Sequence, residues 1–258
     1  MHEAYFAAGA RVAISASYQV SRQAMASVGL AAGAADDALR LSVELAREAR
    51  TRSGLAGLLV AASVGPYGAA LADGSEYRGQ YGRTHEELVQ FHAERLAVLA
   101  QAAPDLFAVE TIPDAFEAAA VVEALAEHSD VPAWISFSCK DDATTCGGDA
   151  YVDAVRLAAS APSVVAVGVN CTAPEHVGAL LSAARTVTEL PLVVYPNAGR
   201  TWDAGTRAWT GAWADALPRD EVRGWAAAGA RLIGGCCGLG PQAIEEIAAA
   251  LSSGSRLA

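Results

Sequence analysis

No stretch of eighteen consecutive apolar residues occurs in the sequence, although 53% of its 258 residues are hydrophobic. A membrane-spanning helix needs roughly 20 such residues, so we expect none. The segment from Met1 to Tyr5 has no basic region followed by an apolar stretch, and no secretory signal is therefore expected. The apolar content excludes a disordered chain. Together these features predict a cytoplasmic globular protein.

Clusters of lysine and arginine are also absent. The chain has 18 Lys and Arg against 29 Asp and Glu, which gives a formal net charge of −11. An acidic surface of this kind disfavours binding to nucleic acid or to an anionic membrane. No coiled-coil repeat or obvious docking helix is evident in the sequence. We therefore expect a monomer whose partners are small molecules.

The cysteines do not form a disulfide framework. The chain contains five of them, an odd number for its size. Cys236 and Cys237 are adjacent, and one peptide bond holds their Cα atoms too close for ordinary disulfide geometry. In a reducing compartment, grouped thiols indicate a metal site or catalysis. For Cys139 and Cys146, a place in the apolar core is at least as good an interpretation.

Short runs rich in valine and isoleucine alternate with helical segments rich in alanine, glutamate and arginine. Near-continuous apolar runs are typical of parallel strands covered on both faces. The expected strands are Val12–Gln19, Gly57–Val64, Leu106–Ile112, Ala133–Cys139, Val164–Cys171, Leu192–Asn197 and Arg231–Cys236. Thr84-His85-Glu86-Glu87 is a capping-box start for one of the intervening helices. These β-then-α units in series predict an α/β fold with a parallel sheet.

Two architectures fit this pattern, a doubly wound open sheet and a (β/α)8 TIM barrel. No Gly-x-Gly-x-x-Gly motif follows the first strand, which disfavours a dinucleotide-binding open sheet. Polar and unusual residues gather at the C-terminal ends of the strands, among them Glu110, Asn170-Cys171 and Cys236-Cys237. In a closed barrel these ends meet on one face. We therefore predict a barrel that forms a single domain over residues 1–258.

The strand count is one short of a complete barrel. A TIM barrel has eight strands, whereas the sequence predicts seven. His2–Ala10 is typical of the last turns of a helix, so the chain starts where a first helix would be ending. We therefore expect an N-terminally truncated barrel of seven β/α units, with two open sheet edges.

Three thiols are expected to converge on one face of this barrel. Cys171 ends one strand, and Cys236-Cys237 ends another. Three thiolates with an open fourth position are the ligand set of a catalytic zinc site. Copper(I) and iron–sulfur clusters also take sulfur ligands, although a closed cluster normally has a fourth cysteine. The histidines lie on expected helices or loops away from these strand ends: His2, His85, His92, His128 and His176.

Several motifs occur together and in order along the chain. They are Ser63–Ala69, Asp73–Gly79, Val109-Glu110-Thr111, Gly168-Val169-Asn170-Cys171, Pro196-Asn197-Ala198-Gly199 and Gly234-Gly235-Cys236-Cys237-Gly238. With these motifs the sequence resembles the homocysteine S-methyltransferase family over nearly its whole length. The first two resemble the branch that uses S-methylmethionine or S-adenosylmethionine. The family's opening motif of the Asp-Gly-Gly type is missing from the first residues of this chain.

This resemblance implies a zinc-dependent enzyme that moves a methyl group from a sulfonium donor to homocysteine and forms methionine. It implies Cys171, Cys236 and Cys237 as the zinc ligands, and Glu110 as the residue that holds the substrate amino group. Zinc would deprotonate the homocysteine thiol. Because a sulfonium leaves as a neutral thioether, no general acid is needed. We therefore expect no catalytic residue beyond the metal site.

Further assignments stay open at this point. Asn170 and Asn197 are candidates for substrate binding, or for support of the surrounding loops. Tyr18 or Tyr67 would either face the sulfonium cation or only pack within a loop. The chain could instead be a truncated, inactive zinc-binding relative, or it could methylate another small thiol or a selenol, or use betaine as the donor. A redox protein using Cys236-Cys237 is disfavoured because the pair is adjacent and no Cys-x-x-Cys motif is present.

Overall fold

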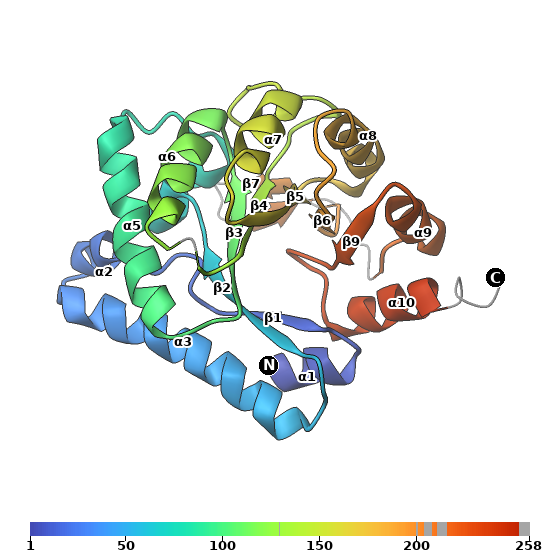
Figure 1. Ribbon diagram of the computed structural model, residues 1–258, viewed down its shortest axis with the longest axis horizontal. Coiled ribbons are helices and arrows are strands. Elements are labelled where there is room, and N and C mark those ends of the chain that lie inside the picture. Colours follow the sequence, from blue (N-terminus) through green and yellow to red (C-terminus); the bar gives the residue numbers. More distant parts are fainter. Residues whose placement is uncertain (129, 200, 204–207, 211–215, 253–258) are drawn as a thin grey trace.

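Seven strands lie side by side in one curled sheet, in the order β1-β2-β3-β4-β5-β6-β9 (Figure 1). The computed structural model describes residues 1–128, 130–199, 201–203, 208–210 and 216–252. Each neighbouring pair of strands is parallel. The strands are β1 Val12–Ile14, β2 Leu59–Val64, β3 Leu106–Ile112, β4 Ala133–Phe137, β5 Val164–Asn170, β6 Leu192–Tyr195 and β9 Ala230–Ile233. The expected α/β class is therefore confirmed.

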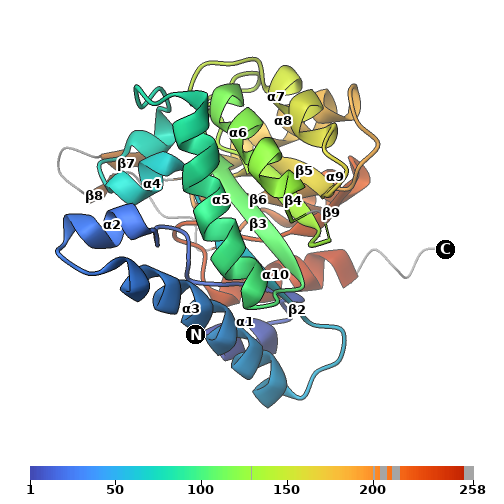
Figure 2. The same ribbon diagram turned by 60° about the vertical axis from the view of Figure 1, so that its left-hand side comes forward.

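Helices follow the strands and cover the outer face of the sheet (Figures 1 and 2). α5 begins as predicted: Thr84 Oγ1 accepts from the Glu87 N–H, and the Glu87 carboxylate accepts from the Thr84 N–H. This capping box satisfies two N–H groups that the helix leaves free. The helices are α1 His2–Ala7, α2 Arg22–Ser27, α3 Ala32–Ser53, α4 Tyr67–Leu71, the 3-10 turn η1 Ser75–Tyr77, α5 His85–Gln101, α6 Ala115–Ala126, α7 Tyr151–Ala159, α8 Pro174–Arg185, α9 Arg219–Ala227 and α10 Pro241–Ser252.

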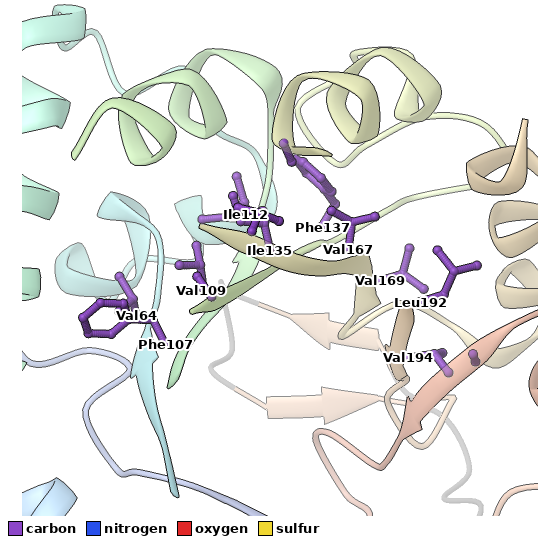
Figure 3. Close-up of a cluster of buried hydrophobic side chains, with 14 of the residues drawn as sticks. Val64, Phe107, Val109, Ile112, Ile135, Phe137, Val167, Val169, Leu192 and Val194 are labelled. Atoms are coloured by element: carbon purple, nitrogen blue, oxygen red, sulfur yellow. The ribbon is translucent and has the colours of Figure 1, made fainter. Parts of the chain in front are cut away.

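Each face of the sheet has its own apolar cluster, because successive side chains of a strand point to opposite faces. On β3, Phe107 and Val109 belong to the outer cluster, whereas Ala108 belongs to the inner one. Figure 3 shows part of the outer cluster, which packs between the strands and the helices. The inner cluster is smaller and includes Trp134 and Tyr195. Its polar atoms are paired, since Trp134 Nε1 donates to the Tyr195 hydroxyl at 3.0 Å.

Two strands, β2 and β3, end where the sequence predicts, at Val64 and Ile112, whereas the other five end earlier. β1 ends at Ile14 rather than at Gln19, and β6 ends at Tyr195 rather than at Asn197. Past these ends, polar side chains bond across neighbouring segments; Ser17 Oγ, for example, donates to the Ser63 carbonyl at 2.8 Å. The sequence analysis also missed an antiparallel pair, β7 Thr201–Asp203 and β8 Ala208–Thr210.

The two edge strands of the sheet are β1 and β9, which do not pair with each other within the described residues. A cavity of about 490 Å³ lies between them, and its apolar lining includes Val12, Ile14, Leu232 and Ile247. The sheet is therefore curled but not closed, as expected for seven units. Among the helices that the structure describes, none is long and apolar enough to cross a membrane.

Candidate metal and substrate site

Three cysteine sulfurs converge just past the ends of β5 and β9. The Sγ atom of Cys237 lies 3.6 Å from that of Cys171 and 3.9 Å from that of Cys236. All three sulfurs lie within 4.8 Å of one another. A tetrahedral zinc ion with Zn–S bonds of about 2.3 Å places its sulfurs about 3.8 Å apart. The spacing therefore fits one tetrahedral ion with its fourth position open.

Backbone hydrogen bonds from the loop after β6 fix this spacing. The Cys171 N–H donates to the Tyr195 carbonyl at 3.1 Å, and the Cys236 N–H donates to the Pro196 carbonyl at 2.8 Å. The Ala198 N–H donates to the Cys237 carbonyl at 2.9 Å. Residues 195–198 thus connect the loop after β5 with the loop after β9. The thiols are held together by the sheet topology rather than by a bond between them.

The three thiols shift one another's pKa values. Hydrogen bonds from the Cys171 and Cys236 thiols lower the pKa of Cys237 to about 3. Hydrogen bonds with the Cys171 and Cys237 thiols, together with burial, raise the pKa of Cys236. Cys237 is therefore the thiol of the three whose pKa is lowered rather than raised. A metal ion would supply the charge needed to ionise all three.

Glu110 is a buried carboxylate next to this thiol cluster. It lies on β3 with 8% of its surface exposed, and its Oε1 accepts from Ser63 Oγ at 2.5 Å. Burial raises the pKa of Glu110 to about 7, although hydrogen bonds with Ser63 and Tyr195 lower it, and the charge of Cys237 also acts on this carboxyl group. An ammonium group would relieve the cost of burying this charge. The structure thus brings Glu110 to the cysteines.

Asn170 joins the ends of β3 and β5. Its Oδ1 accepts from the Thr111 N–H and from Ser136 Oγ, each at 2.7 Å, and its Nδ2 donates to Thr111 Oγ1 at 2.7 Å. Thr111 and Cys171 both have positive φ values, 63° and 47°. Such conformations are costly for residues other than glycine and persist where neighbouring contacts impose them. The contacts of Asn170 favour a supporting role.

Asn197 lies on the other side of Cys171. Its Nδ2 donates to the Cys171 carbonyl at 3.4 Å, and its Oδ1 accepts from the Gly199 N–H at 2.9 Å. The side chain is half-buried. Asn197 therefore contacts the backbone that positions the Cys171 thiol. The binding of Asn197 to substrate stays a prediction.

The two tyrosines considered in the sequence analysis differ in their surroundings. The Tyr67 ring on α4 packs against Tyr81 and against Phe91 on α5, with centroid distances of 5.2 and 5.0 Å. Tyr18 instead hydrogen-bonds with Thr111, and burial together with the Cys171 thiol raises its pKa. Gly65 makes room for it, because a Cβ atom there would lie 2.6 Å from the Tyr18 ring. Of the two, Tyr18 belongs to the site.

Tyr77 was missed by the sequence analysis as a site residue. Its hydroxyl hydrogen-bonds with the Cys171 and Cys237 thiols and lowers the pKa of Cys237. Tyr77 lies on η1, a single 3-10 turn between β2 and α5. The Asp73–Gly79 motif drew attention to this segment, but local sequence pattern alone does not place a one-turn element against strands elsewhere in the sheet.

Buried charges behind the site hold its loops in place. Arg95 on α5 donates from Nη1 to the Gly65 carbonyl at 2.7 Å and from Nη2 to the Tyr18 carbonyl at 2.9 Å. Glu117 on α6 accepts from the Tyr67 N–H at 2.5 Å and from the Tyr81 hydroxyl at 3.0 Å. These contacts connect the outer helices with the loops after β1 and β2.

Known proteins are similar to this chain in sequence and fold. The homocysteine S-methyltransferase family model matches residues 1–251. The chain belongs to the homocysteine S-methyltransferase family. It is 45% identical to homocysteine S-methyltransferase 4 of Zea mays over 97% of this chain and 78% of that protein. With homocysteine S-methyltransferase YbgG of Bacillus subtilis (strain 168) it shares 42% identity over 96% of this chain and 82% of that protein.

Solved structures of a family member agree with the fold. The metallated form of the homocysteine methyltransferase MmuM from Escherichia coli matches with a TM-score of 0.85 and 43% identity, over 96% of this chain and 82% of that chain. Its oxidized form gives the same score, and its apo form gives 0.76. The expected family and the barrel-type fold are therefore confirmed.

Proposed function

We propose that this chain is a zinc-dependent S-methyltransferase that moves a methyl group from S-methylmethionine or S-adenosylmethionine to homocysteine and forms methionine. The triangle of sulfurs from Cys171, Cys236 and Cys237, with spacings of 3.6 and 3.9 Å, is the observation that carries this proposal. Membership of the family supports it. An all-sulfur set favours zinc over magnesium or calcium, which prefer oxygen ligands.

Zinc, when bound to the three cysteines, supplies the positive charge that keeps the acceptor sulfur in its thiolate form at neutral pH. Glu110 holds the ammonium group of homocysteine, and Ser63 orients the carboxylate through its hydrogen bond. Tyr18 and Tyr77 form aromatic walls beside the sulfurs and restrict where the donor can lie. The work of these residues is to position two sulfur atoms in line with one methyl carbon, which accounts for a large share of such a barrier.

The transfer needs no proton relay. The acceptor sulfur forms a bond with the methyl carbon, while the bond from that carbon to the donor sulfur breaks. The electron pair of the broken bond returns to the donor sulfur, which leaves as a neutral thioether. Consistent with this, His92, a fully buried histidine of the described chain, lies behind the site and bonds Glu117 at 3.0 Å rather than facing the thiols.

The test is zinc stoichiometry together with methionine formation from homocysteine and each donor, measured on the 258-residue chain. We expect one zinc per chain, turnover with a sulfonium donor, and a monomer by light scattering. Zinc without turnover would favour the alternative of an inactive zinc-binding relative. Turnover only with a selenol or with another thiol would change the acceptor. Absence of zinc from a folded, reduced sample would overturn the metal assignment.

A further inference from the structure

A second carboxylate besides Glu110, that of Glu76, interacts electrostatically with Cys237 of the thiol cluster. Glu76 belongs to η1 and directly precedes Tyr77, whose hydroxyl hydrogen-bonds with the Cys171 and Cys237 thiols. We propose that Glu76 faces the sulfonium group of the methyl donor and selects for a positively charged sulfur. This inference rests on the proposed function, because it assumes a sulfonium substrate.

The backbone around Glu76 is tightly held. α4 packs directly on η1, since a Cβ atom at Gly68 would lie 2.4 Å from the Glu76 backbone nitrogen. Only a glycine allows this approach. The Asp73 carboxylate accepts from the Ser75 N–H at 2.9 Å, which fixes the entry to the turn. Glu76 is therefore presented to the site by a rigid element, as a specificity residue should be.

The Glu76 side chain is only partly satisfied. Its Oε2 atom is buried and has no hydrogen-bond partner among the described residues. A buried carboxylate oxygen without a partner is costly, and the cost is removed when a cation or a donor arrives. Burial also raises the pKa of Glu76, and the charges of Asp73 and Cys237 act in the same direction. Each of these features would be relieved by a positive charge bound between Glu76 and the thiols.

The buried guanidinium of Arg95 is engaged by other partners. Two nitrogens of Arg95 are used by the carbonyls of Gly65, Ser17 and Tyr18. Glu76 therefore keeps an acceptor for an incoming cation.

The two carboxylates match the charges of the two substrates. Glu110 is buried on β3 inside the sheet, whereas Glu76 lies on a loop element and is half exposed. The charge of Cys237 acts on both carboxyl groups. Homocysteine brings one ammonium group for Glu110. The donor brings a sulfonium, which cannot donate a strong hydrogen bond and is recognised by charge, and Glu76 together with the Tyr18 and Tyr77 rings can supply that recognition.

The position of Glu76 predicts a particular kinetic signature. The sulfonium charge disappears as the methyl group is transferred, so a carboxylate beside it stabilises bound donor more than the transition state. Loss of that carboxylate should raise the KM for the donor without lowering kcat. A residue that only supported the fold would instead lower kcat or the zinc content.

The experiment compares wild type with Glu76→Gln, Glu76→Asp and the exposed control Glu44→Gln on α3. Titration calorimetry on zinc-loaded protein measures the affinity for S-methylmethionine, for methionine and for homocysteine. Methionine serves as the matched probe because it has the same amino-acid group with a neutral sulfur. Steady-state kinetics gives the KM for each substrate, and zinc content and thermal melting report on folding.

For Glu76→Gln we expect S-methylmethionine to bind about 10-fold to 100-fold more weakly, as loss of a charged contact implies. Methionine and homocysteine should bind as in wild type, kcat should not fall, and Glu76→Asp should recover part of the affinity. Equal weakening of methionine would show that Glu76 contacts the amino group, and unchanged donor affinity would remove its role altogether; either result overturns the proposal. If wild type turns over and only the Glu76 result fails, the proposed function stands, whereas a zinc-loaded wild type that binds neither substrate refutes both.

Discussion

The Sγ atoms of Cys171 and Cys237 lie 3.6 Å apart, although 66 residues separate them in the chain. Two further strands of the seven-stranded sheet, β6 and β9, bring the second thiol back to the end of β5. Because the sheet is parallel, each of these strands ends on the same face, and the loops that follow them meet there. The metal site is thus a direct consequence of the topology.

Replacement of any one of Cys171, Cys236 or Cys237 by alanine should abolish tight zinc binding. Mutations of residues that merely support a metal ligand often cost about 10-fold to 100-fold in affinity, so loss of a ligand should exceed about 100-fold. Metal analysis after dialysis against a chelator measures the effect. Cys146→Ala is the matched control, since this half-buried thiol lies outside the cluster and should leave zinc content unchanged. Full zinc retention in one cluster variant would remove that cysteine from the ligand set.

The strands could be predicted from local sequence pattern. The thiol cluster could be predicted from the order of those strands together with parallel topology. A run such as Val164–Asn170 is apolar throughout, and this marks a covered parallel strand. Once the strands are in order, parallel topology alone brings Cys171 and Cys237 to one face. The seven-strand count and the two open edges followed from the same reasoning.

The remaining site residues depend on contacts that sequence pattern does not encode. The turn η1, which carries Glu76 and Tyr77, packs against α4 only because Gly68 has no side chain. His92 lies on α5 at a position that pattern identifies only as helical, and the structure buries it against Glu117. Arginines are mostly exposed in folded proteins. Arg95, however, is only 2% exposed and donates hydrogen bonds to three carbonyls. In each case the contacts that determine the role of the residue come from a segment that is distant in the sequence.

Glu110 should make the stability of the metal-free protein depend on pH. Burial raises its pKa from the ordinary 4.5 to about 7, so the folded state holds this proton more tightly than the unfolded chain. Its contribution to stability is therefore complete below pH 4.5 and is lost as the pH rises through 7. The loss is on the order of 3 kcal/mol.

Urea unfolding at a series of pH values checks this, with Glu110→Gln as the comparison. The variant should remove most of the decline between mildly acidic and mildly alkaline pH, because glutamine does not titrate. It should also bind homocysteine more weakly while zinc content stays at the wild-type level. If wild type and Glu110→Gln show parallel pH profiles, Glu110 does not carry the buried proton.

Gly168→Ala should be strongly destabilising. Gly168 on β5 pairs with Val193 on β6, and a Cβ atom there would lie 1.8 Å from the Val193 carbonyl oxygen. The backbone of the central sheet would have to move, at a cost of about 3 kcal/mol or more. Gly178→Ala on α8 is the control, because nothing lies within 4 Å of its added Cβ, and the helix should gain up to about 1 kcal/mol. Equal melting temperatures for the two variants would contradict this packing.

Arg95→Lys should weaken both the fold and the site. The guanidinium reaches three carbonyls, those of Gly65, Ser17 and Tyr18, at 2.7, 3.2 and 2.9 Å. A lysine ammonium is a single point on a flexible stem and cannot span the same fork of acceptors. At least one buried carbonyl then loses its partner, and we expect a loss of about 2 kcal/mol in stability.

The same substitution tests whether Arg95 positions the loops that form the site. Tyr18 lies beside Cys171, and Gly65 leaves room for the Tyr18 ring. A shift of the Gly65 or Tyr18 carbonyl would therefore move the Tyr18 ring, which lines the site. We therefore expect a higher KM for the methyl donor at a temperature where the variant remains folded, with zinc content unchanged. Arg156→Lys is the control, because this exposed arginine on α7 forms a surface ion pair with Asp153 at 2.5 Å. A variant at Arg95 that melts early but keeps the wild-type KM would limit the residue to a structural role, since loop position and substrate binding would then be independent.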